Sequence, residues 1–209
     1  MTNEAEVKPF FPPCYNKWEA IHGGKADEKK LEQDDIPIEP LLQAVELLAT
    51  FYDSMGSIFG KIKDELLGNV KKARDHIPAG VKTMKAGFEA EKAANAWKND
   101  PGFCVGAYWM MNSLRFLVET LRNLKKDQKV GVGECVKDSY KQTLMKHHGF
   151  VLRTMFKGLL SAAVPNRKDL EGKLAPTPEQ LQKDLEKFLE ICTPYLDFCE
   201  AHNPHNEGK

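Results

Sequence analysis

Residues 103–127 read FCVGAYWMMNSLRFLVETLRNLKKD. Their apolar side chains recur at i, i+3, i+4 and i+7, which is the spacing of one face of an α-helix. Tyr108, Trp109 and Phe116 widen this apolar stripe beyond a single face. Because a helix that is apolar over so much of its girth must be covered on more than one side, we expect this segment at the centre of the fold.

The rest of the chain from residue 36 onward follows the same helical period, without the Val, Ile and Thr alternation of strands. A second wide apolar stripe falls within residues 143–163. Thr177-Pro178-Glu179 is typical of a helix cap and first turn. The sequence therefore predicts an all-α fold with helices at 38–54, 57–75, 79–97, 103–127, 134–163 and 178–201.

The first 35 residues differ from the remainder. Phe10-Phe11-Pro12-Pro13 is apolar but conformationally restricted, Gly23-Gly24 is a break, and residues 25–35 are mostly charged. We expect residues 1–35 to form an extended arm whose aromatic side chains dock on one domain that spans residues 36–209. The docking aromatics would be Phe10, Phe11 and Trp18.

The composition argues against a nucleic-acid-binding, secreted or membrane-spanning protein. The chain is 42% hydrophobic, with 30 basic and 30 acidic residues, so it can bury a core but has no basic excess for nucleic acid. It has neither a basic segment followed by an apolar one at its start nor an apolar run of about 18 residues. Its five cysteines are an odd set without a CxxC pair, which favours free thiols. We expect a soluble, cytoplasmic protein that does not bind nucleic acid.

A row of polar side chains interrupts the helix at 57–75. At about 100° per residue, Glu65, Asn69 and Lys72 fall within an arc of roughly 60° beside an apolar stripe. Asp64 points nearly opposite, toward solvent. An ordinary amphipathic edge would explain the row, but Asn69 is a weak helix former placed nearest the core. An acceptor, an amide and a cation on one face also suit a ligand rich in hydroxyl groups, with the Trp109 ring stacked against it.

His148 interrupts the second stripe, between Leu144 and Val151. It is either a core histidine bonded to a backbone carbonyl or a ligand contact. His147 is rotated about 100° away and is expected at the rim. Adjacent histidines on a helix do not share a metal ion, because ligands on one face are spaced by three or four residues. The sequence therefore predicts no metal at this position.

Sequence motifs for catalysis, cofactor binding or metal binding are weak or absent. Gly131-Val132-Gly133 follows no strand, and Pro204 interrupts the spacing of Cys199, His202 and His205, so neither a dinucleotide nor a zinc site is expected. No nucleophile elbow, zinc-protease motif or P-loop is present. We therefore expect binding without catalysis and without a cofactor.

Four segments together resemble the glycolipid transfer protein family. They are residues 51–57 (FYDSMGS), residues 65–72 (ELLGNVKK), residues 109–116 (WMMNSLRF), and the run from His148-Gly149-Phe150 through Met155-Phe156 to residues 162–165 (AAVP). Their order and spacing agree with the family over residues 36–168, with a looser match in the last helix. The resemblance implies a two-layer sandwich of about eight helices that encloses a hydrophobic lipid pocket and transfers glycosphingolipids between membranes.

The resemblance also implies roles for single residues. Asn69 and Lys72 would bind the first sugar, Trp109 would stack on it, and His148 would bind the ceramide carbonyl. The carboxylate that receives the ceramide amide is an aspartate in the family and Glu65 here. Its extra methylene moves the carboxylate outward by about 1.5 Å, one C–C bond length. Apolar residues would line the pocket: Phe51, Tyr52, Phe116, Leu152, Phe156 and Leu160.

The family docks on membranes through a tryptophan at the position of Phe150. Phe150 keeps an apolar ring but loses the indole N–H that favours the membrane interface. On a continuous helix it would point about 200° from His148, away from the apolar stripe, so we expect it to be exposed. Lys146, Arg153 and Lys157 are near enough in sequence to attract anionic lipid headgroups. The implied protein is a monomer that contacts membranes transiently.

Three alternatives stay open at this level. A carrier of phosphorylated ceramide would have the same fold, but relatives of that type place cationic residues where Asn69 and Trp109 stand. A glycolipid sensor or scaffold would bind without net transport. An all-α enzyme would need a catalytic constellation that the motifs do not supply.

Overall fold

The computed structural model describes residues 7–150, 153–154, 156, 158 and 164–207, and over these residues its regular elements are all helices. The expected all-α class is confirmed. The residues described contain a single isolated β-bridge, between Pro37 and Thr83.

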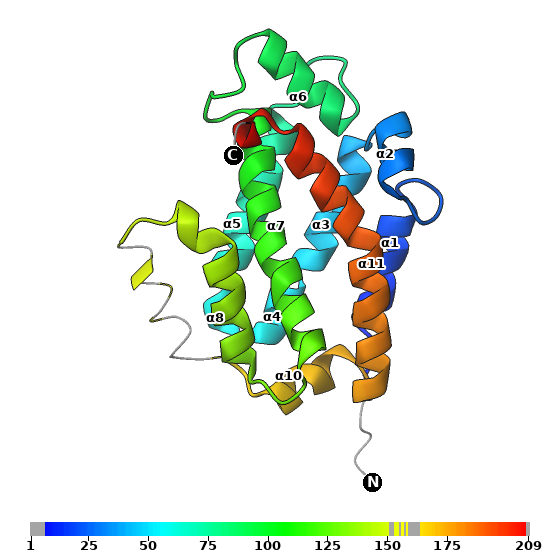
Figure 1. The fold of residues 1–209 in the computed structure, drawn as a ribbon, viewed down its shortest axis with the longest axis vertical. Helices are drawn as coiled ribbons and strands as arrows, with labels where there is room; N and C mark the ends of the chain where they lie inside the picture. The colour runs from blue at the N-terminus through cyan, green and yellow to red at the C-terminus, as the bar shows by residue number, and fades with distance from the viewer. Residues whose placement is uncertain (1–6, 151–152, 155, 157, 159–163, 208–209) are drawn as a thin grey trace.

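Two layers of helices make up the body of the molecule (Figure 1). One layer has α7 at its centre, flanked by α8 and α11, and their bounds are Phe103–Lys126, Val132–Gln142 and Pro178–His202. The other layer packs α3 between α1 and α5, whose bounds are Ile38–Ala49, Phe11–Glu19 and Gly60–Asp75. The expected two-layer sandwich is therefore confirmed.

Shorter elements close the ends of the sandwich. At the end where the C-terminus lies are α2, α6 and η3, which span Glu28–Asp34, Met84–Ala93 and Pro204–Asn206. At the opposite end are α4 and α10, which span Phe51–Met55 and Arg167–Leu174. The 3₁₀ turns η1 and η2 span Ser57–Phe59 and Leu144–His147. The predicted cap of α11 is confirmed, because the Thr177 side chain accepts a hydrogen bond from the Gln180 backbone N–H.

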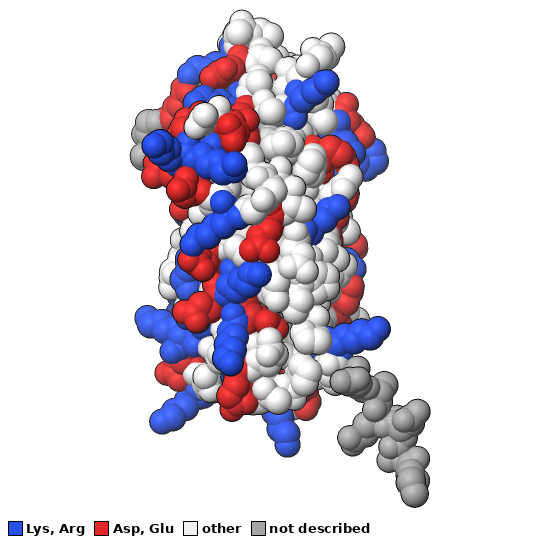
Figure 2. All heavy atoms as spheres, turned by 90° about the vertical axis from the view of Figure 1, so that its right-hand side faces the viewer, with Lys and Arg blue, Asp and Glu red and all other residues white. Residues whose placement is uncertain are grey.

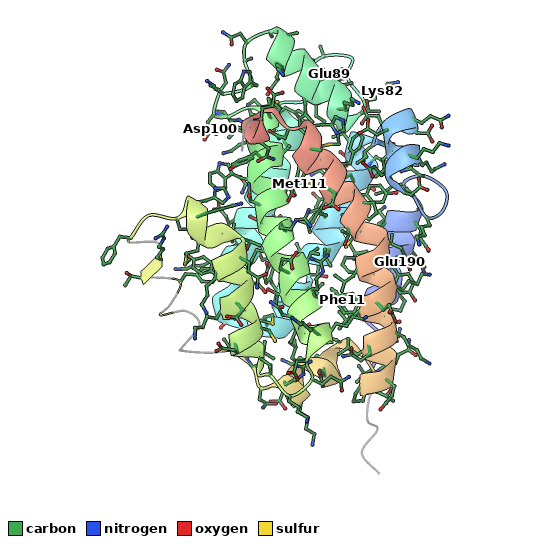
Figure 3. All side chains as sticks on the ribbon, in the orientation of Figure 1. Phe11, Lys82, Glu89, Asp100, Met111 and Glu190 are labelled. Carbon is green, nitrogen blue, oxygen red and sulfur yellow. The ribbon has the colours of Figure 1, made fainter. Side chains whose placement is uncertain are left out.

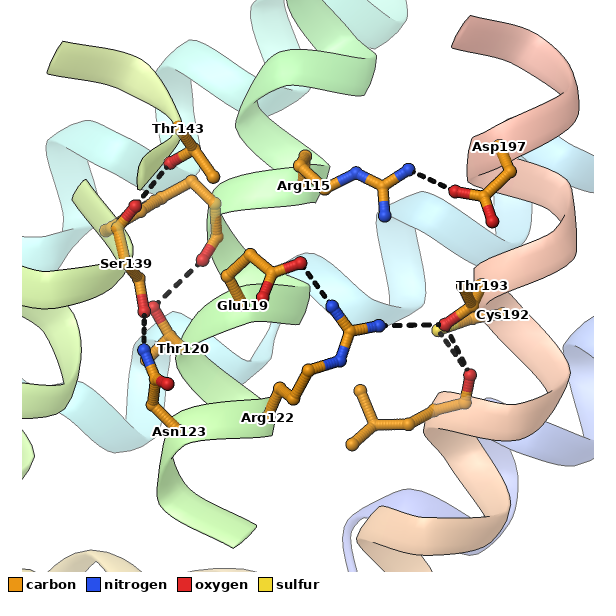
Figure 4. Close-up of polar contacts among 12 residues, drawn as sticks. Arg115, Glu119, Thr120, Arg122, Asn123, Ser139, Thr143, Cys192, Thr193 and Asp197 are labelled. Atoms are coloured by element: carbon orange, nitrogen blue, oxygen red, sulfur yellow. Dashed lines mark hydrogen bonds and ion pairs between the residues drawn. The ribbon is translucent and has the colours of Figure 1, made fainter. Parts of the chain in front are cut away.

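The central helix is α7, as its wide apolar stripe predicts. Leu114, Leu117 and Val118 are fully buried between the layers. Polar side chains on its other flanks tie it to both neighbours in its own layer (Figure 4): Arg115 pairs with Asp197 of α11, and Asn123 donates to Ser139 Oγ of α8 at 2.9 Å.

A close crossing joins the two layers at the start of α7. A Cβ atom on Gly106 would lie 2.5 Å from the backbone nitrogen of Ala73. The N-terminal end of α7 thus meets the C-terminal end of α5, and the extensive contact between the two helices makes them antiparallel. This crossing sets the level at which side chains of the two helices meet.

The prediction of an extended N-terminal arm is wrong, although the expected docking of its aromatic residues is confirmed. Residues 11–19 and 28–34 are helical, and Phe11 and Trp18 are fully buried. Pro12 and Pro13 lie in the first turn of α1, where a missing backbone N–H costs no helical hydrogen bond. The Trp18 ring packs edge-on against Phe188 and Tyr195 of α11.

Two predicted helices are too long. The segment before α6 is extended and pairs with residues 36–38: Ile38 donates its N–H to Lys82 O at 2.9 Å and Met84 donates to Ile36 O at 2.8 Å. The helix expected at 134–163 ends at Gln142. There the Thr143 hydroxyl turns back to the Ser139 carbonyl at 2.7 Å, and the chain continues as η2 and then an extended His148.

All five cysteines are buried and unpaired, so the expected free thiols are confirmed. Burial raises the pKa of the Cys14 and Cys192 thiols to about 12. On the face formed by α1, α2 and α11, acidic and basic side chains are interspersed without a large patch of one sign (Figure 2). Among the described residues, none of the helices combines the length and the apolar character that a bilayer crossing needs.

Candidate functional site

The polar row of α5 consists of Glu65, Asn69 and Lys72, and its middle member is a buried amide. Asn69 is 5% exposed, and its Nδ2 lies 3.4 Å from Glu65 Oε1. Glu65 itself is exposed, as is Asp64. The predicted inward direction of Asn69 is confirmed, whereas the Glu65 side chain is exposed to solvent.

Lys72 lies one turn beyond Asn69 and is half-buried. Its Nζ forms an ion pair with Asp100 Oδ1 at 2.8 Å. Asp100 belongs to the loop between α6 and α7, near the start of α7, where Figure 3 labels it. Asp100 could not be predicted from the sequence, because it is far from α5 along the chain and belongs to no periodic pattern.

Trp109 of α7 faces the same region. It follows Gly106 by three residues, and Gly106 is packed against the backbone of Lys72 and Ala73. Because the helices are antiparallel, one turn down α7 from Gly106 is at the level of Asn69. The Trp109 side chain is half-buried, and the His147 ring packs edge-on against it at 5.7 Å between centroids.

His148 lies in an extended linker after η2, not on a helix as expected. Its Nδ1 lies 3.0 Å from the Tyr140 hydroxyl. Burial and the nearby Arg153 guanidinium lower the pKa of His148, and the Glu65 carboxylate opposes this shift. The imidazole is therefore neutral at pH 7 and lies near Glu65 of α5.

Tyr140 and His147 are members of the site that the sequence did not reveal. Where the Tyr140 hydroxyl donates to His148 Nδ1, the neutral ring carries its proton on Nε2 and can donate it to a carbonyl oxygen. His147 contacts both Trp109 and Tyr108 rather than standing at the rim. The helix ends before His148, and this break allows both the contact of His148 with Tyr140 and the contact of His147 with Trp109. A helical wheel, which assumes a continuous helix, cannot show either contact.

Four of the six expected pocket residues are described, and all four are buried: Phe51, Tyr52, Phe116 and Phe156. Leu152 and Leu160 lie outside the described residues. Phe116 and Phe156 are brought together, with ring centroids 5.6 Å apart, and Tyr140 stacks on Phe156 at 3.9 Å. This aromatic cluster lies directly beside His148, whose ring centroid is 6.4 Å from that of Phe156.

Phe51 and Tyr52 form a second aromatic cluster toward the other end of the sandwich. Phe51 contacts Phe10, and the Tyr52 ring is parallel to that of Phe59 at 6.4 Å. The Tyr52 hydroxyl is buried and has no hydrogen-bond partner among the described residues, and burial raises its pKa. No ring contact between described residues joins the two clusters.

Phe150 is 84% exposed, as expected, although the continuous helix with His148 on which that expectation rested is absent. It is the most exposed large apolar side chain among the described residues. Lys146 and Arg153 are exposed on either side of it in sequence, whereas Lys157 lies outside the described residues. An exposed aromatic ring with cations beside it can enter the interface of a bilayer.

These residues comprise a buried amide, a half-buried indole, a lysine, two exposed carboxylates and a neutral histidine, and the histidine lies next to a cluster of buried aromatic rings. Amide and charged groups can bind hydroxyls, an indole can pack on the apolar face of a ring, and a neutral histidine can donate to an amide carbonyl. These properties fit a ligand that is polar at one end and apolar at the other.

The chain is similar to proteins of known family and structure. The curated glycolipid transfer protein of Aureobasidium melanogenum is 29% identical over 193 residues, which are 84% of this chain and 94% of that protein. HET-C2, a fungal glycolipid transfer protein of known structure, has a TM-score of 0.72 and 25% identity, and the match covers 81% of this chain and 86% of the other.

The apo form of mouse ceramide-1-phosphate transfer protein has a TM-score of 0.78, with 93% and 95% of the two chains covered, but only 15% identity, so it shows the fold alone. The sequence model of the family described as "Glycolipid transfer protein (GLTP)" matches residues 36–176. The chain therefore belongs to the glycolipid transfer protein family.

Proposed function

We propose that this protein binds a glycosphingolipid and carries it between membranes without a chemical reaction. The observation that carries the proposal is the close crossing of α5 and α7 at Gly106 and Ala73, because one turn along each helix from it are a buried amide, Asn69, and a half-buried indole, Trp109. An amide satisfies sugar hydroxyls as both donor and acceptor, and an indole packs on the apolar face of a pyranose. Relatives named for glycolipid transfer support the same role.

In this proposal the two ends of the lipid are bound separately. Asn69, Lys72 and Trp109 bind the sugar, Glu65 accepts from the ceramide amide N–H, and His148 donates to the ceramide carbonyl. The hydrocarbon chains enter between the layers, where Phe116 and Phe156 already form an apolar wall next to His148. Phe51 and Tyr52 would line the pocket from the second aromatic cluster, and Leu152 and Leu160, which lie outside the described residues, stay predicted lining residues.

We assign the docking of the protein on the bilayer to Phe150. Because Phe150 is exposed and follows His148 by two residues, its insertion would bring the mouth of the site to the membrane surface. We propose that this contact is transient and that the carrier works as a cytoplasmic monomer. The division of the chain at residue 35 stays a prediction.

Transfer between vesicles tests the function directly. Donor vesicles would contain glucosyl-, galactosyl- or lactosylceramide, ceramide phosphate or a glycerolipid, each with the same fluorescent acyl chain, and acceptor vesicles would contain no labelled lipid. We expect faster transfer of the glycosylceramides than of the other two. Preference for ceramide phosphate would assign the protein to that class of carriers, and tight binding without transfer would make it a sensor.

A further inference from the structure

Asp100 contacts a residue of the proposed sugar site from outside the helix that bears it. Its Oδ1 lies 2.8 Å from Lys72 Nζ. The Lys72 side chain is 27% exposed and that of Asp100 is 58% exposed, so the carboxylate is the more solvent-accessible partner of the pair. A ligand sugar that reaches Lys72 must therefore approach this carboxylate too.

We propose that Asp100 is a specificity-determining residue that makes the headgroup site selective for neutral, hydroxyl-rich headgroups over phosphate. The inference rests on the proposed function and extends it to the choice of headgroup. It assigns to the loop before α7 a role in ligand recognition.

Hydrogen-bond chemistry is the first reason. A sugar hydroxyl both donates and accepts, so two neighbouring hydroxyls are satisfied by a pair that offers one donor and one acceptor. Lys72 supplies only donors and Asp100 only acceptors. The 2.8 Å pair thus presents both kinds of group at one point, without needing a net charge on the ligand.

Electrostatics is the second reason. A phosphate monoester offers acceptors almost exclusively at pH 7 and is repelled by a carboxylate. Asp100 pairs with Lys72, and Glu65 is exposed one helical turn before Asn69, so two carboxylates accompany Lys72 in this part of the site. The neighbouring Lys98 has its ammonium over the Trp97 ring, and Lys146 and Arg153 are close to His148 in the sequence. A phosphate at Lys72 would therefore have to compete with the Asp100 carboxylate for the lysine.

A purely structural role for the pair is the competing explanation, and the protein contains a matched control. Lys63 pairs with Asp53 at 2.6 Å, with side-chain exposures of 22% and 61%, close to those of Lys72 and Asp100. Both pairs join α5 to a neighbouring segment, but the Lys63 pair lies outside the proposed sugar site. Such exposed pairs contribute little to stability, so neither substitution should unfold the protein.

The test compares Asp100→Asn with Asp53→Asn. Initial rates of transfer of glucosylceramide and ceramide phosphate are measured between vesicles of electrically neutral phosphatidylcholine, so that the charge of the vesicle does not affect docking. We expect Asp100→Asn to lower the ratio of the glucosylceramide rate to the ceramide phosphate rate about tenfold, as for loss of one charge-assisted hydrogen bond. Asp100→Lys should lower it further, and Asp53→Asn should leave it unchanged.

Each outcome decides one question. If the wild-type protein transfers glucosylceramide but Asp100→Asn leaves the ratio unchanged, the inference about Asp100 is wrong and the proposed function stands. If both asparagine variants lower the ratio equally, the effect is one of general charge and the inference is again wrong. If the wild-type protein transfers no glycosylceramide, the proposed function itself fails. Thermal unfolding of each variant identifies any change caused by misfolding.

Discussion

His148 depends on a tyrosine eight residues earlier in the chain. The 3.0 Å contact between the Tyr140 hydroxyl and His148 Nδ1 fixes the ring and directs Nε2 away from Tyr140. Tyr140 in turn stacks on Phe156, so one side chain links the polar and the apolar parts of the site. If His148 binds the ceramide amide as proposed, Tyr140 would couple that binding to the binding of the chains.

The first prediction concerns Asn69 and Trp109. Asn69→Ala and Trp109→Ala should each abolish most transfer, because they remove the amide and the ring that orient the sugar. The helical circular-dichroism spectrum should not change. Asn123→Ala is the control, since its amide bonds Ser139 at the other end of α7 and should affect stability alone. Normal transfer by either site variant would remove that residue from the site.

The second prediction separates the two explanations of His148. If His148 binds the ligand, His148→Ala should weaken glycolipid affinity by about tenfold or more, and Tyr140→Phe should weaken it less because only the orientation of the ring is lost. Equilibrium binding of a short-chain glycolipid would measure both. A lower melting temperature of His148→Ala with unchanged affinity would show that the histidine is only a core residue.

The third prediction follows from the lowered pKa of His148. Between that pKa and the ordinary value near 6.5, the unfolded chain binds a proton that the folded one does not, so this group stabilises the fold less as pH falls through the window. Denaturant unfolding at pH 7.5 and 5.5 should show a larger loss for the wild type than for His148→Asn. Equal losses would contradict the shift.

At the scale of elements, the crossing of α5 and α7 sets the geometry of the site. Gly106→Ala would place a methyl group 2.5 Å from the Ala73 nitrogen, so we expect a loss of about 1–3 kcal/mol in unfolding free energy and slower transfer. Gly68→Ala, on the same pair of helices, meets no described atom within 4 Å and should stabilise α5 by about 0.5–1 kcal/mol. Denaturant unfolding of both variants would test this, and equal effects would contradict it.

The sequence predicted the elements whose periodicity reflects burial. The predicted helix at 103–127 corresponds to α7 at Phe103–Lys126, and the one at 178–201 corresponds to α11 at Pro178–His202. It also predicted the inward direction of Asn69, because one polar residue near an apolar stripe is visible on a wheel. Burial along a stripe is a local property, and a sequence pattern records it directly.

Other features required tertiary contacts that no local pattern records. The apolar period runs on through Leu144 although the helix stops at Gln142, so the break before His148 was missed. The N-terminal helices were missed because Pro12, Pro13 and the glycines conceal a segment that α11 stabilises by packing. Asp100 was missed because its contact with Lys72 joins segments 28 residues apart in the sequence.

At the scale of the whole molecule, the fifth prediction concerns docking on a bilayer. Phe150→Ala should reduce vesicle binding and slow transfer, because it removes the most exposed apolar ring among the described residues, while affinity for a soluble short-chain glycolipid should not change. Phe150→Trp should strengthen vesicle binding through the indole N–H. Vesicle sedimentation measures both. Equal loss in the vesicle and short-chain assays would place docking elsewhere.

The positions of the three tryptophans give the molecule an optical signal. Trp18 is fully buried where α1 packs on α11, and the half-buried Trp97 packs against the His205 ring. Trp109 is the tryptophan to which the proposed function assigns the sugar, and it is half open to water. A sugar stacked on it would exclude that water and move its fluorescence emission to shorter wavelength, while Trp18 emits a constant blue-shifted background. Loading and unloading of the carrier can therefore be followed in real time with unlabelled lipid.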